Sequence, residues 1–241
     1  MPRAAAPPAW SRRLMLAGLG LGLATLAERA LAADALARGP RRVSARDALL
    51  AAIARARDVD RGRCTAIEWQ DAMAALWSEC DPADLARTIE VDRLLLGRPL
   101  AARGASVIAV PWWRHLEGEA APRGFGVKVL AFGPGRCNPP HAHAHLVSTH
   151  LVLKGRFTAR HHDKLAETEA AVAIRPTLTL SLVAGQSSSV SDDRDGVHGH
   201  RAGPEGGLLL DVVVSDLAGR ASSTPLLDVE DAAGLGEGGV E

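Results

Sequence analysis

The sequence predicts an all-β barrel or sandwich preceded by a helical segment, and two patterns indicate this fold class. Between about residues 104 and 217, short β-rich runs alternate with turn-forming residues. Between about residues 44 and 97, apolar side chains recur with helical spacing instead. Many short strands without intervening helices are typical of sandwiches and barrels rather than of parallel α/β sheets. At 241 residues, we expect one domain, or one domain with an appendage.

Residues 1–32 have the features of a secretory signal peptide. A basic head without acidic residues precedes an uncharged apolar run at 14–27, and a small-x-small site follows at 30–32. The run is shorter than the roughly 20 apolar residues that a membrane span needs, although a membrane anchor or a buried helix is the alternative. Paired Arg12 and Arg13 after a serine resemble a twin-arginine export signal. We expect a periplasmic or secreted protein with no stable membrane span after signal removal.

Residues 33–103 are expected to form three helices that pack on the outside of the β-structure. Ser44 and Asp47 have the spacing of a helix cap, and Asp81-Pro82 starts a third helix that ends at Gly97. Between them lies an apolar stripe with the spacing of one helix face. The stripe consists of Trp69, Ala72, Met73, Leu76, Trp77 and Cys80.

The β-rich region at 104–217 contains six expected strands, and residues 218–241 are expected to be a loose tail. Gly, Pro, Asn and Asp separate the strands. A polar segment at 187–189 is expected to be a strand edge. The expected strands are 107–113, 127–132, 147–160, 171–174, 177–184 and 208–214.

Three cysteines remain after the signal peptide, Cys64, Cys80 and Cys137. In an oxidising compartment they allow one disulfide, for which Cys64–Cys80 is the candidate. Buried free thiols are the alternative.

Charge and motifs exclude several classes of function. The 28 basic and 28 acidic side chains balance, and basic residues do not cluster with aromatic ones, so we expect no nucleic-acid partner. The chain has no phosphate-binding loop, dinucleotide-binding glycine pattern or nucleophile elbow.

Histidines are concentrated in the β-rich region, where eight of the nine lie between residues 141 and 200. His141 and His143 are two residues apart, so on a strand they point to the same face and can share a metal ion. Pro139-Pro140 stiffens the segment before them. An HxH pair alone is also common on exposed surfaces. His161-His162 beside Asp163 predicts a solvated turn.

The spacing around this pair resembles the first sequence motif of the cupin superfamily. Gly135, His141-x-His143 and Gly155 fall at the motif's positions, and Ser148 stands where the motif has glutamate. The resemblance covers about residues 104–217. It implies a double-stranded β-helix, or jelly-roll barrel, with a metal ion inside.

The second cupin motif supplies one more histidine, and here the resemblance is looser. Gly185 opens the stretch, a longer turn replaces the motif's proline–glycine turn, and Ala202 replaces an asparagine. We assign His198 as the third metal ligand, with His200, on the same strand face, as its rival. The role of His145 stays open, and the isolated His115 has no assigned role.

With serine in place of glutamate, the ligand set resembles the three-histidine, cysteine dioxygenase-like branch of cupins, which binds Fe(II). Zn, Mn, Ni or Cu also suit imidazole ligands. Thiol dioxygenases of that branch use a tyrosine, and this chain has none. Ser148 and His150 are expected to face the interior, with His150 as a fourth ligand or a base. By alternation Arg156 and Arg160 are expected on the same face, where either would bind a substrate carboxylate. Exposed arginines on a barrel strand, the commoner case, are the alternative.

The resemblance therefore favours an exported, non-haem Fe(II) dioxygenase-like enzyme that acts on a small molecule, such as a thiol. A non-catalytic metal-binding or ligand-binding cupin, acting as sensor or carrier, is the first alternative. A metal-dependent isomerase or lyase of the same fold is the second. By analogy with cupins, we expect a homodimer.

Overall fold

The computed structural model describes residues 43–111, 122–167 and 172–223. The predicted signal peptide at 1–32 and most of the predicted tail at 218–241 lie outside them. The described residues belong to one compact unit, Arg41–Glu241. None of the helices found among them is long and apolar enough to cross a membrane.

The amino-terminal helical segment is confirmed, with four helices among the described residues in place of three. They are α2 (Ala45–Asp60), α3 (Ala66–Ser78), α4 (Pro82–Thr88) and α5 (Val91–Leu95). Ser44 caps α2 by accepting a hydrogen bond from the N–H of Asp47, and Asp81 caps α4 in the same way. The expected third helix is split because Glu90 has a left-handed φ of 55°. A right-handed α-helix does not continue through that conformation.

Seven antiparallel strands are described after the helices. They are β1 (Ala105–Ala109), β2 (Phe125–Phe132), β3 (His141–Ala142), β4 (Val147–Glu167), β5 (Val172–Val183), β6 (Ser187–Ser191) and β7 (Val197–Val214). The strands expected at 127–132, 147–160 and 208–214 are parts of β2, β4 and β7. Those expected at 171–174 and 177–184 are joined in β5, and the polar segment at 187–189 lies in β6.

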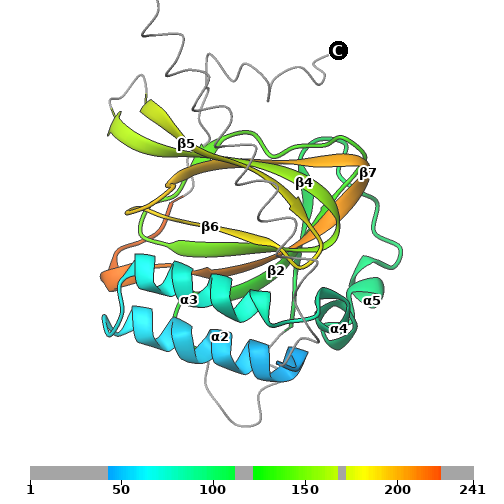
Figure 1. Ribbon diagram of the computed structural model, residues 1–241, viewed down its shortest axis with the longest axis horizontal. Helices are drawn as coiled ribbons and strands as arrows, with labels where there is room; N and C mark the ends of the chain where they lie inside the picture. The colour runs from blue at the N-terminus through cyan, green and yellow to red at the C-terminus, as the bar shows by residue number, and fades with distance from the viewer. Residues whose placement is uncertain (1–42, 112–121, 168–171, 224–241) are drawn as a thin grey trace, which may run out of the picture. The chain divides into compact units, whose positions relative to one another are not determined.

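Two long strands, β4 and β7, each pass through both layers of a two-layered β-structure (Figure 1). Residues 147–155 of β4 and 207–214 of β7 pair with each other and with β6 and β2, and β1 pairs with β2 at the edge. Residues 157–162 of β4 and 197–202 of β7 pair in the other layer, where β5 and β3 flank them. Layers that share strands in this way form a closed jelly roll.

Glycines allow β4 and β7 to bend where they pass between layers. Gly155 has φ of +86°, and a Cβ atom there would lie 2.4 Å from the carbonyl oxygen of Gly206. A Cβ atom on Gly207 would lie 2.6 Å from the ring of Phe157. The strand register also shifts between Gly155 and Phe157. The last glycine of the first cupin-like motif is therefore required by close backbone packing at a bend.

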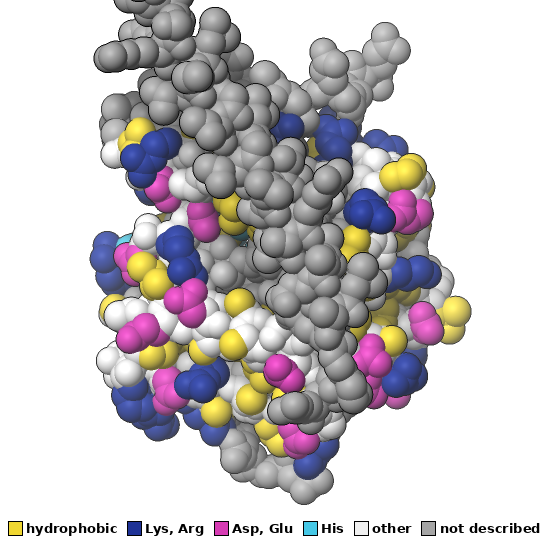
Figure 2. Space-filling model, viewed as in Figure 1, with side chains coloured by type: hydrophobic (Ala, Val, Ile, Leu, Met, Phe, Trp, Pro, Cys, Tyr) yellow, Lys and Arg dark blue, Asp and Glu magenta, His cyan; other side chains and the backbone are white. Residues whose placement is uncertain are grey.

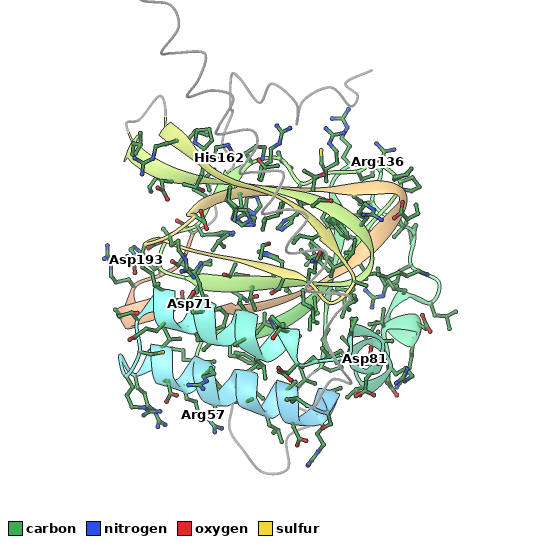
Figure 3. All side chains as sticks on the ribbon, viewed as in Figure 1. Arg57, Asp71, Asp81, Arg136, His162 and Asp193 are labelled. Carbon is green, nitrogen blue, oxygen red and sulfur yellow. The ribbon has the colours of Figure 1, made fainter. Side chains whose placement is uncertain are left out.

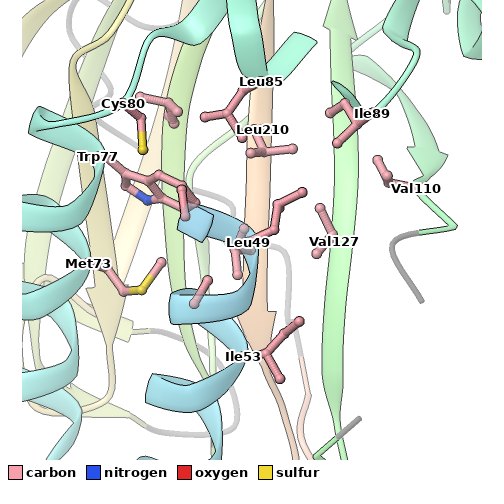
Figure 4. Packing of buried hydrophobic residues seen from close by; sticks show 14 of the residues in the cluster. Leu49, Ile53, Met73, Trp77, Cys80, Leu85, Ile89, Val110, Val127 and Leu210 are labelled. Carbon is pink, nitrogen blue, oxygen red and sulfur yellow. The ribbon is translucent and has the colours of Figure 1, made fainter. Parts of the chain in front are cut away.

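Helices α2 and α3 lie against the layer that contains β2 and the second half of β7 (Figure 1). Trp69, Met73 and Trp77 of the predicted stripe are completely buried. Figure 4 shows Leu49 of α2 in the same cluster as Trp77 of α3, Val127 of β2 and Leu210 of β7. Full burial of such side chains contributes about 1.5–3 kcal/mol each. The expectation that the helices pack on the outside of the barrel is confirmed.

The interior of the barrel has an apolar end and a polar end. The apolar end is a cluster of buried side chains from β2, β4, β5 and β7, in which the rings of Phe132 and Phe157 meet edge to face at 5.3 Å. The buried polar side chains come from β4, β6 and β7. They are Ser148, His150, His161, Ser188, His198, His200 and Asp211.

Charged side chains of both signs are interspersed over the described part of the face shown in Figure 2. This pattern agrees with the equal numbers of basic and acidic residues. All three cysteines are free thiols. The candidate disulfide Cys64–Cys80 is therefore not formed. Of the buried free thiols that were the alternative, only Cys80 is fully buried, and Cys64 and Cys137 are partly buried.

Candidate metal centre

The structure brings His141, His143 and His198 together at the polar end of the barrel. His141 in β3 lies opposite His198 in β7, and one ring nitrogen of each of the three lies within 4.8 Å of those of the other two. The ring centroids are 4.3 Å apart for His141–His198, 4.9 Å for His141–His143 and 5.0 Å for His143–His198. We call these residues the outer triad. Their meeting is what the sequence interpretation requires; their role as metal ligands stays a prediction.

The backbone before β3 fixes the tautomer of His141. Its Nδ1 lies 2.9 Å from the carbonyl oxygen of Pro139. A carbonyl oxygen only accepts hydrogen bonds, so Nδ1 carries the proton and donates. The lone pair is then on Nε2, and a ligating histidine commonly has such a partner on its other nitrogen. The Pro139-Pro140 segment therefore orients one ligand as well as stiffening the chain.

Burial keeps the outer triad neutral at pH 7. Removal from water lowers the pKa of His141, although its hydrogen bond to Pro139 works against the shift. Burial, with a smaller effect of His141, lowers the pKa of His143 to about 4. Burial also places the pKa of His198 well below its ordinary value. Neutral imidazoles have the free lone pair that a metal ion needs, so these residues fit a divalent transition metal.

A buried carboxylate, Asp211, lies beside the expected positions of Ser148 and His150. The Ser148 hydroxyl donates to Asp211 Oδ1 at 2.5 Å, and His150 Nε2 lies 3.8 Å from the same oxygen. Lys128 Nζ is 3.9 Å from Oδ2. Burial raises the pKa of Asp211, although Lys128 and the hydrogen bond from Ser148 oppose the shift. Ser148 and His150 are buried in the interior, where the sequence placed them.

Asp211 was missed by the sequence analysis, although the sequence carries a signal for it. It is the one charged residue in the apolar run Leu208–Val214. A charge inside a buried strand is expensive unless it has partners, so such a residue indicates a functional or paired group. With Ser148 at the glutamate position of the motif, the interior still has a carboxylate, but it comes from β7.

The expectation of a solvated turn at His161-His162 is wrong. β4 continues through both residues and pairs with β5 and β7 as far as Glu167. His161 is 1% exposed, and its ring lies 6.0 Å from that of His198. Burial lowers its pKa to about 4. His162 is only half-buried and points away from the helices, on the other side of the strand (Figure 3).

Arg160 does not face the interior with Ser148 and His150, so that expectation is also wrong. Alternation along one regular strand would have placed it there, but the register shifts between Gly155 and Phe157. After this shift Ala159 and His161 are buried, and Arg160 between them lies on the opposite face. A role in binding an interior carboxylate is therefore not available to Arg160.

Both candidates for the third ligand, His198 and His200, lie near other histidines, because the interior contains a second cluster. His150, His198 and His200, which we call the inner triad, also have one ring nitrogen each within 4.8 Å of the others. His198 belongs to both triads, whereas His200 lies with His150. His198 is therefore the residue that completes the outer triad.

His145 stands apart from both triads. It has φ of +59°, its backbone N–H donates to Asp192 Oδ2 at 2.8 Å, and its Nδ1 lies 3.6 Å from the same oxygen. These contacts hold the loop after β3. His115 lies outside the described residues.

A pocket of about 310 Å³ lies between β5 and β6. Leu178 and Leu180 line one side and Ser188 another, and His161 forms part of its wall. Arg194 and Asp71, whose ion pair is 2.8 Å long, also line it. Ser188 Oγ lies 3.2 Å from His200 Nε2, so the pocket borders the interior histidines.

No family model and no curated protein sequence matches this chain. Among solved structures, the chain is similar to an uncharacterized conserved protein with a double-stranded β-helix domain from Klebsiella pneumoniae. They share 22% identity with a TM-score of 0.39, over 58% of this chain and 89% of that one. An oxalate oxidase shows 19% sequence identity and a TM-score of 0.33, over 48% of this chain and 53% of the oxidase chain. The coconut allergen cocosin shows 16% sequence identity and a TM-score of 0.38, over 54% of this chain and 30% of the cocosin chain.

These likenesses are too distant to assign a site, which rests on the geometry of this chain's own side chains. The fold itself agrees with the sequence resemblance. The chain forms a mostly antiparallel jelly-roll barrel, the fold that the cupin-like motif implies, with a helical segment before its strands.

Proposed function

We propose that this protein is an exported, metal-dependent cupin that acts on a small molecule as a non-haem dioxygenase-like enzyme. The observation that carries the proposal is the convergence of three neutral imidazoles, His141, His143 and His198, on one point of the barrel interior. Three protein ligands leave coordination positions open, which is typical of catalytic rather than structural sites. Fe(II) is the ion we favour, with Zn, Mn, Ni or Cu as alternatives for an all-imidazole set.

A bound Fe(II) would supply open positions at which dioxygen and substrate meet. The chain's own residues would orient the metal ligands and transfer protons to and from the substrate. His141 is held by the carbonyl oxygen of Pro139, and Asp211 with Ser148 offers a buried proton-transfer group next to His150. The pocket between β5 and β6 is lined by His161 and by none of the outer triad, and it has the size of small-molecule sites, which start at about 300 Å³.

The three-histidine, cysteine dioxygenase-like branch enters this proposal through the ligand set alone. The chain contains no tyrosine, so a cysteine–tyrosine crosslink is excluded. A thiol substrate is therefore proposed only from the resemblance of the three-imidazole ligand set to that branch. Other small molecules should be included in the oxygen-uptake assay.

A metal-dependent isomerase or lyase is the second candidate, and Asp211 favours it. Its raised pKa and its hydrogen bond from Ser148 suit a group that takes and returns a proton beside a metal ion. Such an enzyme would convert its substrate without consuming oxygen.

Localisation and partners are part of the proposal. Residues 1–32 would direct export by the twin-arginine route to the periplasm or beyond. The mature protein would bind a small molecule, form a homodimer and bind neither nucleic acid nor membrane.

Metal content and oxygen uptake test this proposal together. We expect tag-free protein from the exported fraction to contain one iron per chain and to consume oxygen with a member of a thiol panel. His141→Ala and His143→Ala should each lose the oxygen uptake. His162→Ala, which changes a histidine on the far face of β4, is the matched control and should keep both its iron and the uptake. Bound metal without oxygen uptake in the wild type would contradict the oxygenase and leave the isomerase or a carrier. Undiminished oxygen uptake in the His141→Ala and His143→Ala variants would contradict the site.

A further inference from the structure

The inner triad, His150, His198 and His200, is more deeply buried than the outer one. Its members are 4%, 1% and 0% exposed, whereas His141 and His143 are only partly buried. The ring centroids lie 4.7 Å apart for His150–His200, 4.9 Å for His150–His198 and 5.3 Å for His198–His200. Three imidazoles therefore meet where bulk water does not reach.

Ring nitrogens in this cluster lack partners. The Nδ1 atoms of His150, His198 and His200 are buried and make no hydrogen bond with any described residue. Both ring nitrogens of neighbouring His161 are in the same condition. A buried polar atom without a partner costs about 1–3 kcal/mol, and folded proteins leave few of them. Five such atoms in one cluster indicate that something other than a side chain satisfies them.

Polar side chains lie on the Nε2 side of two of these rings, and Nδ1 is the ring atom without a partner. Ser188 Oγ lies 3.2 Å from Nε2 of His200, and Asp211 Oδ1 lies 3.8 Å from Nε2 of His150. The Asp211 carboxylate favours a proton on Nε2 of His150, and the Ser188 hydroxyl can accept one from Nε2 of His200. Metal-ligating histidines commonly have a hydroxyl, carbonyl or carboxylate in this position.

We propose that His150, His198 and His200 form an inner metal site that takes a borderline transition-metal ion such as Zn²⁺ or Co²⁺. Imidazoles without thiolate or carboxylate suit such ions. His198 belongs to both triads, and a neutral imidazole has one lone pair. The two sites are therefore alternatives, and each chain holds one ion, either in the outer position or in the inner one.

The test separates the two sites by removing the residues that they do not share. The metal-free full chain is titrated with Co²⁺, and its visible absorption and its stoichiometry by equilibrium dialysis are recorded. We expect one Co²⁺ per chain in the wild type. The double variant His141→Ala/His143→Ala should still bind one Co²⁺, with a changed spectrum. Adding His200→Asn should weaken this binding by more than about 100-fold. Loss of a residue that only hydrogen-bonds to a metal ligand already costs about 10–100-fold in affinity, and His200 would be a ligand itself.

A folded double variant that binds no Co²⁺ would overturn the inner site and leave the outer one intact. A double variant that matches the wild type in spectrum and affinity would instead overturn the outer site of the proposed function. Two Co²⁺ ions per wild-type chain would overturn the alternation. Circular dichroism checks the fold, His162→Ala is the control, and His143→Ala alone serves if the double variant does not fold.

Discussion

His141 and His198 lie directly opposite each other in the β3–β7 pair, with their ring centroids 4.3 Å apart. They come from distant parts of the sequence, so only the closed barrel brings them together. This pairing makes His198 the shared residue of the outer and inner triads.

Replacement of His198 should therefore remove metal binding altogether. His198→Ala takes a ligand from both triads, so neither keeps three imidazoles. We expect the affinity for Zn²⁺ to fall by more than about 100-fold, measured by competition with a chelator. His200→Asn should leave the outer triad complete and retain most of the affinity. Comparable affinities for the His198→Ala variant and the wild type would show that neither triad binds the ion.

Replacement of Asp211 separates metal binding from proton transfer. Asp211→Asn keeps the shape of the side chain but removes the charge beside Ser148 and His150. We expect unchanged metal stoichiometry and a kcat lower by about 100-fold, the usual size of a general acid–base contribution. The pH profile of kcat should lose one limb. A profile of unchanged shape with a lower Tm would show that Asp211 acts only on stability.

The metal-free protein should lose stability as the pH falls from about 6.5 towards 4. In the unfolded chain a histidine takes a proton near pH 6.5. In the folded chain His143 and His161 take theirs near pH 4, so the unfolded state binds more protons within this window. Stability therefore rises with pH there, by up to ~1.4 kcal/mol per pH unit for each such group. The raised pKa of Asp211 makes stability fall with rising pH, but this is one group against several histidines.

Urea unfolding of the metal-free protein at several pH values measures this slope. His143→Asn removes one of the contributing groups and should flatten it. A free energy of unfolding that does not change between pH 6.5 and 4.5 would contradict the buried, neutral state of these histidines.

Gly155 should tolerate no side chain. Gly155→Ala would place a Cβ atom 2.4 Å from the carbonyl oxygen of Gly206, at a φ of +86°. We expect a loss of about 3 kcal/mol or more from strain and overpacking together. Gly62 also has a positive φ but open space around it, so Gly62→Ala should cost about 1 kcal/mol. Equal costs for the two variants, measured by chemical unfolding, would contradict the close packing of β4 against β7.

Local patterns in the sequence predicted what depends on neighbouring residues. The caps at Ser44 and Asp81, the α3 stripe and the same-face pair His141 and His143 are all short-range features, and the structure contains each of them. His198 was predicted from the resemblance to the second cupin motif, because that motif relates residues on strands that are distant in the sequence.

Features that depend on long-range pairing were not predictable in the same way. The shift at Gly155 reverses which side chains of β4 face inward, so Arg160 lies on the outer face and His161 is buried. The partnership of Ser148 with Asp211 joins two strands whose register no local pattern fixes. Glu90 interrupts a helix although its neighbours favour one.

X-ray absorption fine structure of the Zn²⁺-loaded His200→Asn variant tests the outer triad most directly, because the inner triad is then incomplete. The account predicts three imidazole nitrogens at about 2.0–2.1 Å from zinc, completed by water. A first shell with one imidazole or none would contradict it.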